Sequence, residues 1–191
     1  MFIKGSRAIA DHRQNIEIPR VAQGRQPDYE GELVIVISRD CKNVKKDEAM
    51  DYVLGYTVGN DVSTRAWQLD EKYAGPMPQA TFSKSFDTYA PLGPCIVSRK
   101  VLTDPQSLQI RTWVNQSLRQ DASTRDMLFD VSTLISFLSQ GTTLEAGSII
   151  FTGTPGGVGA FQSPPQFLAH GDVVQIAIEK IGTLENKVVN V

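Results

Sequence analysis

Apolar residues are concentrated in short runs, and most of these runs have the pattern of β-strands. Residues 33–37 have the sequence Leu-Val-Ile-Val-Ile, an uninterrupted apolar run that is typical of a strand covered on both faces. Residues 56–58 and 148–152 are two further strand candidates. Residues 172–179 alternate apolar and polar side chains over their second half, as in a strand with one buried face. The pattern predicts a central strand at 33–37 with several strands around it.

Helical periodicity occurs in two segments. Asp130 precedes apolar residues at positions 131, 134, 135 and 138, and Gly141 follows them, which predicts a helix capped by the Asp130 side chain. Asp47 precedes apolar residues at positions 50, 53 and 54, and Gly55 is placed to end a second, short helix. Residues 68–83 lack periodicity and contain two prolines, so we expect a long loop there.

The order of these elements favours a β-rich α+β fold. Strands outnumber helices, and turns separate them where a doubly wound sheet would have regular crossover helices. A chain of 191 residues with 41% hydrophobic content is long enough for one well-buried core and short for two full domains. We therefore expect residues 1–191 to form a single domain.

Composition excludes several classes of partner. The chain has 19 basic and 21 acidic residues with a net charge of −2, and it has no basic stripe with interleaved aromatic residues that would favour nucleic acid. No run of 18 apolar residues predicts a membrane span, and the first residues lack the apolar core of a secretory signal. Cys41 and Cys95 are far apart, as expected of reduced thiols. These features predict a cytoplasmic protein.

Two acidic residues stand at the start of the central strand. Glu30 and Glu32 are separated by Gly31, and residues two apart on a strand project to the same face. Two carboxylates near a core repel each other and lose solvation, so they need protons, a basic partner or a metal ion. A solvated strand end decorated with glutamates is the alternative explanation of this pair.

A third carboxylate follows the next strand candidate. Asp61 lies in the turn after residues 56–58, where an adjacent strand of the same sheet would bring it close to Glu30 and Glu32. Three oxygen ligands without a cysteine or histidine suit a hard ion, Mg²⁺ or Mn²⁺, better than zinc. The sequence therefore predicts a metal site with open positions for water or a chelating 2-oxo acid.

Four stretches in this order give the chain a resemblance to the catalytic domain of the fumarylacetoacetate hydrolase family. They are residues 28–33 (DYEGEL), 54–63 (LGYTVGNDVS), 84–94 (KSFDTYAPLGP) and 152–159 (TGTPGGVG). Several long motifs in the correct order are more specific than any single one. The resemblance covers nearly the whole chain and implies a mixed β-sandwich or β-roll with a few short helices, and a homodimer.

The resemblance also implies roles for individual residues. Glu30, Glu32 and Asp61 would hold the metal ion, which agrees with the reasoning from the residues. Lys84 and Gln68 would be catalytic and lie near the oxygen or water of the reacting centre, where a fixed cation and an amide stabilise developing negative charge. The residues implied to bind the substrate are Arg65, Gly153 and Thr154.

Each of these roles has an ordinary structural alternative. Lys84 and Arg65 would otherwise be solvated surface cations, and Gln68 an ordinary loop amide. The glycine-rich turn at 152–159 lacks the Gly-Lys-Ser/Thr ending of a phosphate-binding loop. Its backbone N–H groups could instead hold a carboxylate, or it could be no more than a tight turn after a strand.

One part of the family pattern is not recognised in the sequence. Family hydrolases resemble one another in an N-terminal lid segment whose His and Glu activate water, and the similarity here begins at Met1, after that segment. We therefore expect a catalytic domain that lacks the lid, with a mitochondrial location as an alternative if upstream residues exist. His12 lies in a polar stretch away from the motifs and His170 in a predicted turn, so neither is expected to replace the lid histidine.

The resemblance implies a Mg²⁺- or Mn²⁺-dependent enzyme that cleaves a C–C bond of a small 2-oxo acid or diacid. An acylpyruvate hydrolase and an oxaloacetate decarboxylase both fit, with a metal-chelated enolate as the shared species. Two alternatives stay open. One is a keto–enol tautomerase or isomerase, and the other is a catalytically impaired homologue that binds metal and ligand.

Overall fold

Twelve strands form two five-stranded sheets and one two-stranded pair in the computed structural model, which describes residues 1–191. The strands are β1 Ile9–Ala10, β2 Ile16–Ile18, β3 Pro27–Asp28, β4 Gly31–Ile37, β5 Val53–Asn60, β6 Ser63–Thr64, β7 Ala90–Ser98, β8 Gln109–Val114, β9 Ser117–Ser123, β10 Ile149–Phe151, β11 Val173–Ile178 and β12 Gly182–Asn190. The α-helices are α1 Arg65–Leu69, α2 Glu71–Ala74, α3 Ala80–Lys84 and α4 Val131–Leu138. Four 3₁₀ turns complete the list: Ser6–Ala8, Ala49–Tyr52, Thr124–Asp126 and Gly159–Phe161.

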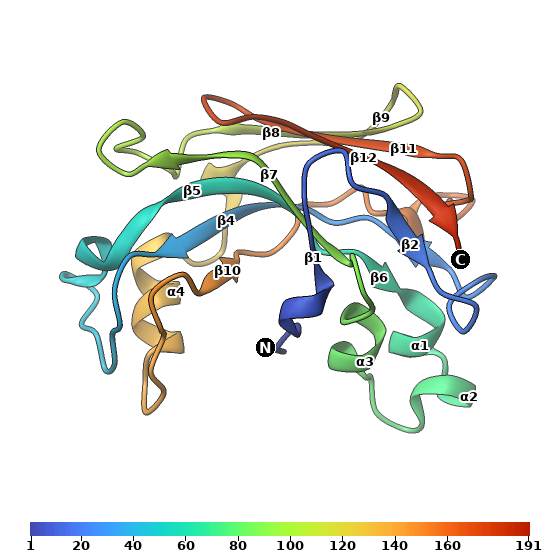
Figure 1. Ribbon diagram of the computed structural model, residues 1–191, viewed down its shortest axis with the longest axis horizontal. Helices are drawn as coiled ribbons and strands as arrows, with labels where there is room; N and C mark the ends of the chain where they lie inside the picture. Colours follow the sequence, from blue (N-terminus) through green and yellow to red (C-terminus); the bar gives the residue numbers. More distant parts are fainter.

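The two large sheets lie one above the other (Figure 1). The first sheet has the strand order β1-β7-β5-β4-β10, and the second has the order β2-β12-β11-β8-β9. Apolar side chains from both sheets form one continuous core between them. Helix α4 lies below one end of the first sheet, and helices α1, α2 and α3 gather below the other end (Figure 1). The β-rich α+β fold expected from the sequence is confirmed.

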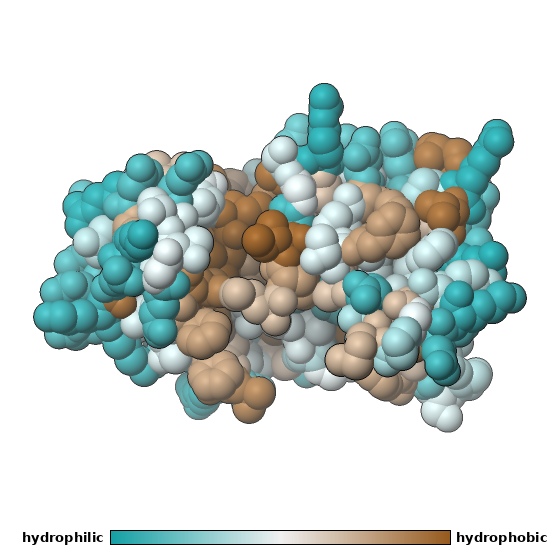
Figure 2. Space-filling model, turned by 90° about the horizontal axis from the view of Figure 1, so that it is seen from below, coloured by the Kyte–Doolittle hydropathy of each residue, from teal (hydrophilic) through white to brown (hydrophobic).

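Strand β4 is buried along its whole length. Leu33, Ile35 and Ile37 belong to the core between the sheets. Because side chains alternate along a strand, the two valines between them, which are also buried, project to the lower face of the first sheet. Apolar side chains gather there in a hollow between two more polar ends (Figure 2). The prediction of a strand covered on both faces is confirmed.

Other sequence predictions are also confirmed. Strand β5 includes the candidate at 56–58, strand β10 lies within 148–152, and strand β11 alternates buried and half-buried residues. Helix α4 begins after Asp130, whose side chain accepts a hydrogen bond from the Thr133 backbone N–H at 2.7 Å. Gly141 follows the helix with a positive φ of 68°, a conformation that glycine adopts without the penalty of a Cβ atom.

The helix predicted after Asp47 is wrong. The structure has a single 3₁₀ turn there, and Val53 already begins strand β5, paired with Ile37 of β4. Val53 is buried and Leu54 is about half exposed, so these neighbours alternate as in a strand instead of sharing one helical face. Pairing along β4 therefore outweighs the local spacing of apolar residues.

The loop predicted at 68–83 is also wrong. The segment contains the end of α1, the whole of α2 and most of α3. These helices have only four or five residues each and are too short to show periodicity. Asp70 caps α2 by accepting a hydrogen bond from the Lys72 backbone N–H at 3.0 Å. Contacts between the aromatic rings of Trp67, Tyr73 and Phe82 pack the three helices together.

The longest helix has eight residues, and none is of the length and apolarity needed to cross a membrane. Cys41 is buried, Cys95 is exposed, and they form no disulfide with each other. The free cysteines agree with the expectation of reduced thiols.

Replacement of the helix cap tests the assignment of α4. We predict that Asp130→Ala lowers the free energy of unfolding by about 1 kcal/mol at neutral pH, because the Thr133 N–H loses its partner. Lys46, 2.8 Å from the carboxylate, and the Thr133 hydrogen bond lower the pKa of Asp130. The stabilisation by Asp130 is therefore fully present above the ordinary aspartate pKa. It is lost as the pH falls through the lowered pKa of Asp130 in the folded protein.

Urea unfolding followed by circular dichroism at pH 7 and in acid measures this difference. Asp47→Ala is the control, because Asp47 is exposed and caps no helix, and its expected effect is within about 0.5 kcal/mol. Equal destabilisation by the two variants would contradict the assigned cap.

Candidate metal centre and active site

Three carboxylates converge beside the lower face of the first sheet. One oxygen each from Glu30, Glu32 and Asp61 lies within 4.8 Å of the other two, and all three residues are buried. Glu30 and Glu32 flank Gly31 at the start of β4, and Asp61 follows the end of β5. The structure therefore brings together the three residues that the sequence predicts as metal ligands.

The antiparallel pairing of β4 with β5 explains this convergence. Gly31 lies opposite Asn60 in the ladder, so the start of one strand meets the end of the other. The Asp61 backbone N–H donates to the Glu30 carbonyl at 2.9 Å, and the Asn60 side-chain oxygen accepts from the Glu30 N–H at 3.0 Å. The backbone positions of two of the carboxylates are thus fixed by direct hydrogen bonds.

Two lysine ammonium groups lie among the carboxylates. Lys84, at the end of α3, places Nζ 3.0 Å from Glu30 Oε2 and 2.7 Å from Asp61 Oδ2. Lys4 comes from the N-terminal segment, and its Nζ lies 2.6 Å from Asp61 Oδ1. Lys4 also donates to the carbonyls of Val62 and Tyr89. Burial lowers the pKa of Lys4, and the negative charge of Asp61 opposes this shift.

Arg65 supplies a third cation from the start of α1. Its Nη1 lies 2.7 Å from Glu30 Oε1, and its Nε lies 2.8 Å from Asp28 Oδ2. Burial alone would lower the pKa of Arg65, but the charges of Glu30 and Asp28 raise it. Nη2 of Arg65 is buried and has no hydrogen-bond partner. Arg65 and Lys84 are therefore buried at the carboxylates and are not solvated surface cations.

Glu32 is the one carboxylate of the three without a cationic partner. Its Oε2 accepts a hydrogen bond from the Gly153 backbone N–H at 2.6 Å, and it forms no ion pair. Burial, followed by the charges of Asp61 and Glu30, raises the pKa of Glu32 well above its usual range. A buried acid that is costly to ionise, beside two further carboxylates, is an arrangement that a divalent cation relieves.

The donor set fits Mg²⁺ or Mn²⁺. It offers carboxylate oxygens alone, without thiolate or imidazole, which is the chemistry that hard divalent ions prefer. Four carboxylates, including Asp28, and the three cations Lys4, Arg65 and Lys84 carry a formal charge of −1 together. A divalent ion would change this to +1. The loaded cluster would then attract an anionic ligand instead of repelling it.

Gly153 and Thr154, both predicted to bind substrate, lie beside the carboxylates. The Gly153 N–H donates to Glu32, and the Thr154 hydroxyl donates to the Gly31 carbonyl at 3.0 Å. The backbone N–H groups of Thr154 and Gly156 have no partner within the chain. These two backbone groups are therefore free donors of the turn, whereas the Gly153 N–H and the Thr154 hydroxyl hold the site together.

Gln68 lies next to the site but does not contact the carboxylates directly. Its Oε1 accepts a hydrogen bond from Arg65 Nη1 at 2.9 Å, and its side chain is half-buried. Gln68 is therefore linked to the carboxylates through the guanidinium of Arg65, which bonds both Gln68 and Glu30. Its predicted catalytic role stays a prediction.

Sequence reasoning missed three side chains of this site, namely Lys4, Asp28 and Gln120, whose Oε1 accepts a hydrogen bond from the Gly31 N–H. Lys4 is 57 residues from Asp61 along the chain, and no local sequence pattern indicates such a contact. Asp28 had a usable signal, because positions 28, 30 and 32 are alternating acids. Its carboxylate is fully buried and accepts hydrogen bonds from the backbone N–H groups of Tyr29, Gly159 and Ala160.

The two histidines lie apart from the carboxylates. His12 Nδ1 accepts a hydrogen bond from the Glu185 N–H, and His170 Nδ1 accepts one from the Asn190 N–H, both at 3.1 Å. Both bonds stabilise the chain near strand β12. No histidine of this chain is therefore in place to act as a general base at the site.

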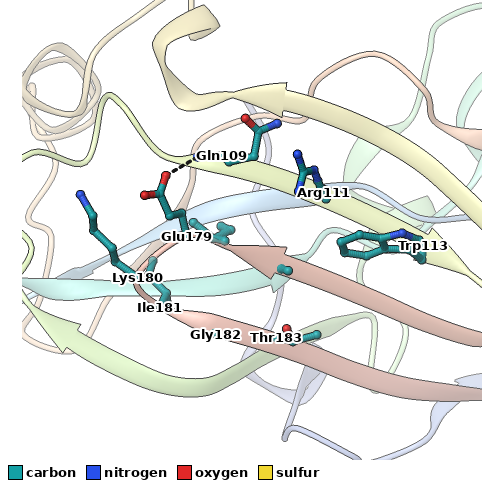
Figure 3. Close-up of a pocket in the computed structure, with 10 residues that line it drawn as sticks. Gln109, Arg111, Trp113, Glu179, Lys180, Ile181, Gly182 and Thr183 are labelled. Atoms are coloured by element: carbon teal, nitrogen blue, oxygen red, sulfur yellow. Dashed lines mark hydrogen bonds between the residues drawn. The ribbon is translucent and has the colours of Figure 1, made fainter. Parts of the chain in front are cut away.

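A groove of about 530 Å³ lies on the outer face of the second sheet. Figure 3 shows Arg111 and Trp113 of β8 and Glu179 after β11 along it. Arg111 is paired with Asp121 at 3.1 Å, and the Glu179 carboxylate accepts a hydrogen bond from the Gln109 N–H. The groove has no cluster of buried polar groups, so the carboxylate centre is the stronger candidate for a functional site.

Comparison with known proteins agrees with this geometry. A family profile described as Fumarylacetoacetate (FAA) hydrolase C-terminal matches residues 1–189. A mitochondrial oxaloacetate tautomerase of Xenopus laevis is 42% identical over 189 residues, which cover 99% of this chain and 57% of that protein. The chain therefore spans less than two thirds of the length of this relative.

Solved structures show the same fold. A fumarylacetoacetate hydrolase from Exiguobacterium antarcticum is 39% identical with a TM-score of 0.90, and the match covers 98% of this chain and 65% of that one. A maleylpyruvate hydrolase from Sphingobium sp. SYK-6, solved with manganese(II) and pyruvate, is 33% identical with a TM-score of 0.84, covering 98% and 63%.

The position of Lys4 leads to a prediction about metal affinity. Lys4→Met should lower the dissociation constant for Mn²⁺ on the order of tenfold or more, because it removes a positive charge and frees an oxygen of Asp61. Isothermal titration calorimetry measures the change, with Lys45→Met, at an exposed position, as the control. Unchanged or weaker binding in Lys4→Met would show that Lys4 does not compete with the ion.

Proposed function

Because the chain belongs to the fumarylacetoacetate hydrolase family, we propose that residues 1–191 are a catalytic domain that acts on a small 2-oxo acid with Mg²⁺ or Mn²⁺. The observation that carries the proposal is the buried cluster of Glu30, Glu32 and Asp61 surrounded by three cations. The maleylpyruvate hydrolase with manganese and pyruvate supports both the type of ion and the type of ligand.

One carboxylate oxygen each from Glu30, Glu32 and Asp61 would hold the ion. When bound, it would act as a Lewis acid toward the adjacent oxygen atoms of a 2-oxo acid. Carboxylates carry the negative charge that offsets the ion. Because Glu32 is the ligand without a cationic partner, it is the residue on which ion binding should depend most.

The cations would recognise and polarise the substrate. Lys84 and Lys4 hold ammonium groups at the carboxylates, where they would stabilise negative charge that develops on the substrate oxygen during enolisation. Arg65 has a buried Nη2 with no partner, which would donate to a substrate oxygen. The unpaired N–H groups of Thr154 and Gly156 would donate hydrogen bonds to the substrate carboxylate, as backbone nests do, in a turn that Gly153 anchors to Glu32.

Enolisation is common to the candidate reactions, namely acylpyruvate hydrolysis, oxaloacetate decarboxylation and keto–enol tautomerisation. Hydrolysis also requires a base that activates water. Tautomerisation requires only proton movement between keto and enol forms, for which the site offers carboxylates and cations. The named activity of the Xenopus laevis relative favours tautomerisation of a 2-oxo diacid such as oxaloacetate.

The homodimer and the cytoplasmic location stay predictions of the family resemblance and of the sequence. The catalytic role of Gln68 also stays a prediction. Gln68 contacts Arg65, so it would act on the substrate through that residue. A homologue that binds a metal ion without turnover is the competing account.

An activity measurement separates these accounts. We predict that the chain with Mg²⁺ changes the enol absorbance of oxaloacetate faster than the ion alone. Glu32→Gln and Lys84→Met should each lower kcat by a factor of about 10² or more. Pyruvate release, measured in parallel, separates decarboxylation from tautomerisation, and an acylpyruvate tests hydrolysis.

Lys45→Met, at an exposed position, is the control and should keep the wild-type rate. Equal rates for Glu32→Gln and wild type would refute the assigned site. Binding of Mn²⁺ without turnover of any of these substrates would favour the competing account, a homologue that binds a metal ion but is not an active enzyme.

A further inference from the structure

One buried amide from the second sheet reaches the metal centre of the first. Gln120 is the only buried residue of strand β9 and is 1% exposed. Its side chain points away from the solvent face of its own sheet and toward the start of β4. A buried amide has to satisfy two donors and an acceptor, so its partners indicate what it does.

All of the polar groups of Gln120 are used on two segments of the site. Its Oε1 accepts a hydrogen bond from the Gly31 backbone N–H at 3.0 Å. Its Nε2 donates to the Thr154 hydroxyl at 2.8 Å and to the Pro155 carbonyl at 2.9 Å. The amide therefore joins the β4 strand to the glycine-rich turn that follows β10.

These contacts close a ring of hydrogen bonds around the residue between two predicted metal ligands. Gly31 is held at its N–H by Gln120 and at its carbonyl by Thr154. Thr154 is held in turn by Gln120. The same turn donates the Gly153 N–H to Glu32. Gln120 thus ties the strand that carries Glu32 to the turn that donates a hydrogen bond to the Glu32 carboxylate.

Close packing leaves this ring little freedom to adjust. A Cβ atom at Gly31 would lie 2.4 Å from the Thr112 hydroxyl oxygen, so only glycine lets β4 approach the second sheet this closely. At Gly157, with φ +106°, a Cβ atom would lie 2.1 Å from the Arg119 carbonyl. Both glycines bring the site against strands β8 and β9, within reach of the short amide of Gln120.

We propose that Gln120 is a positioning residue that aims Glu32 and the turn at 153–156 toward the metal ion. It does so through Gly31 and Thr154 and does not itself touch the ion or the substrate. The inference rests on the proposed function, since it concerns the same metal centre. Residues that orient metal ligands typically change metal affinity by 10–100-fold when replaced.

Gln120→Met tests the proposal, because methionine has a similar length and none of the amide hydrogen bonds. Mn²⁺ binding to the metal-free chain is measured by calorimetry, and folding is checked by circular dichroism. We expect the Mn²⁺ dissociation constant to rise about tenfold or more. Gln175→Met is the matched control, since Gln175 is half-buried in the same sheet and bonds only Glu185 through its side chain.

Thr154→Val tests the same link from the turn and keeps the test decisive if Gln120→Met does not fold. It should also weaken Mn²⁺ binding. Both side chains act through one ring of hydrogen bonds. The loss of Mn²⁺ binding free energy in the double variant should therefore be smaller than the sum of the losses in the two single variants. Additive effects, or wild-type affinity in either single variant, would overturn the proposal.

The outcome for the wild-type chain separates this inference from the proposed function. Wild-type Mn²⁺ binding with Glu32-dependent turnover, together with an unaffected Gln120→Met variant, would refute the positioning role alone. Absence of Mn²⁺ binding by the wild-type chain would refute the metal centre, and the role of Gln120 with it.

Discussion

The energetic cost of burying several carboxylates in one place governs the arrangement of this protein. One oxygen each from Glu30, Glu32 and Asp61 lies within 4.8 Å of the other two, and the three residues are nearly inaccessible to water. Like charges at such distances cannot all be ionised without compensation. The chain supplies three cations that pair with Glu30, Asp61 and the nearby Asp28, and Glu32 is left to be neutralised by a proton or a metal ion.

The fold brings this compensation from distant parts of the sequence. The first sheet places the acids by pairing β4 with β5, and the short helices α1 and α3 present Arg65 and Lys84 from one end of the molecule (Figure 1). The N-terminal segment adds Lys4, and the second sheet adds the amide of Gln120. Two layers are thus used for more than a shared apolar core, because Gln120 of the upper layer also bonds the start of β4 in the lower one.

The sequence predicts those features whose cause is local. The strand at 33–37 follows from an uninterrupted apolar run, and the grouping of Glu30, Glu32 and Asp61 follows from spacing and strand order. The helix expected after Asp47 was wrong, because pairing of Val53 with Ile37 overrides helical spacing. Lys4 and Gln120 could not be found in this way, since an isolated lysine or glutamine has no pattern that reveals a partner 57 or 89 residues away.

If the buried acids form a metal site that acts on anionic 2-oxo acids, anomalous scattering from crystals of the chain grown with Mn²⁺ and pyruvate will locate both. We expect a manganese peak within bonding distance of one oxygen each from Glu30, Glu32 and Asp61, with pyruvate beside it. A peak elsewhere, or none with Lys4 and Lys84 still bonded to the acids, would instead indicate a cluster neutralised by its own lysines.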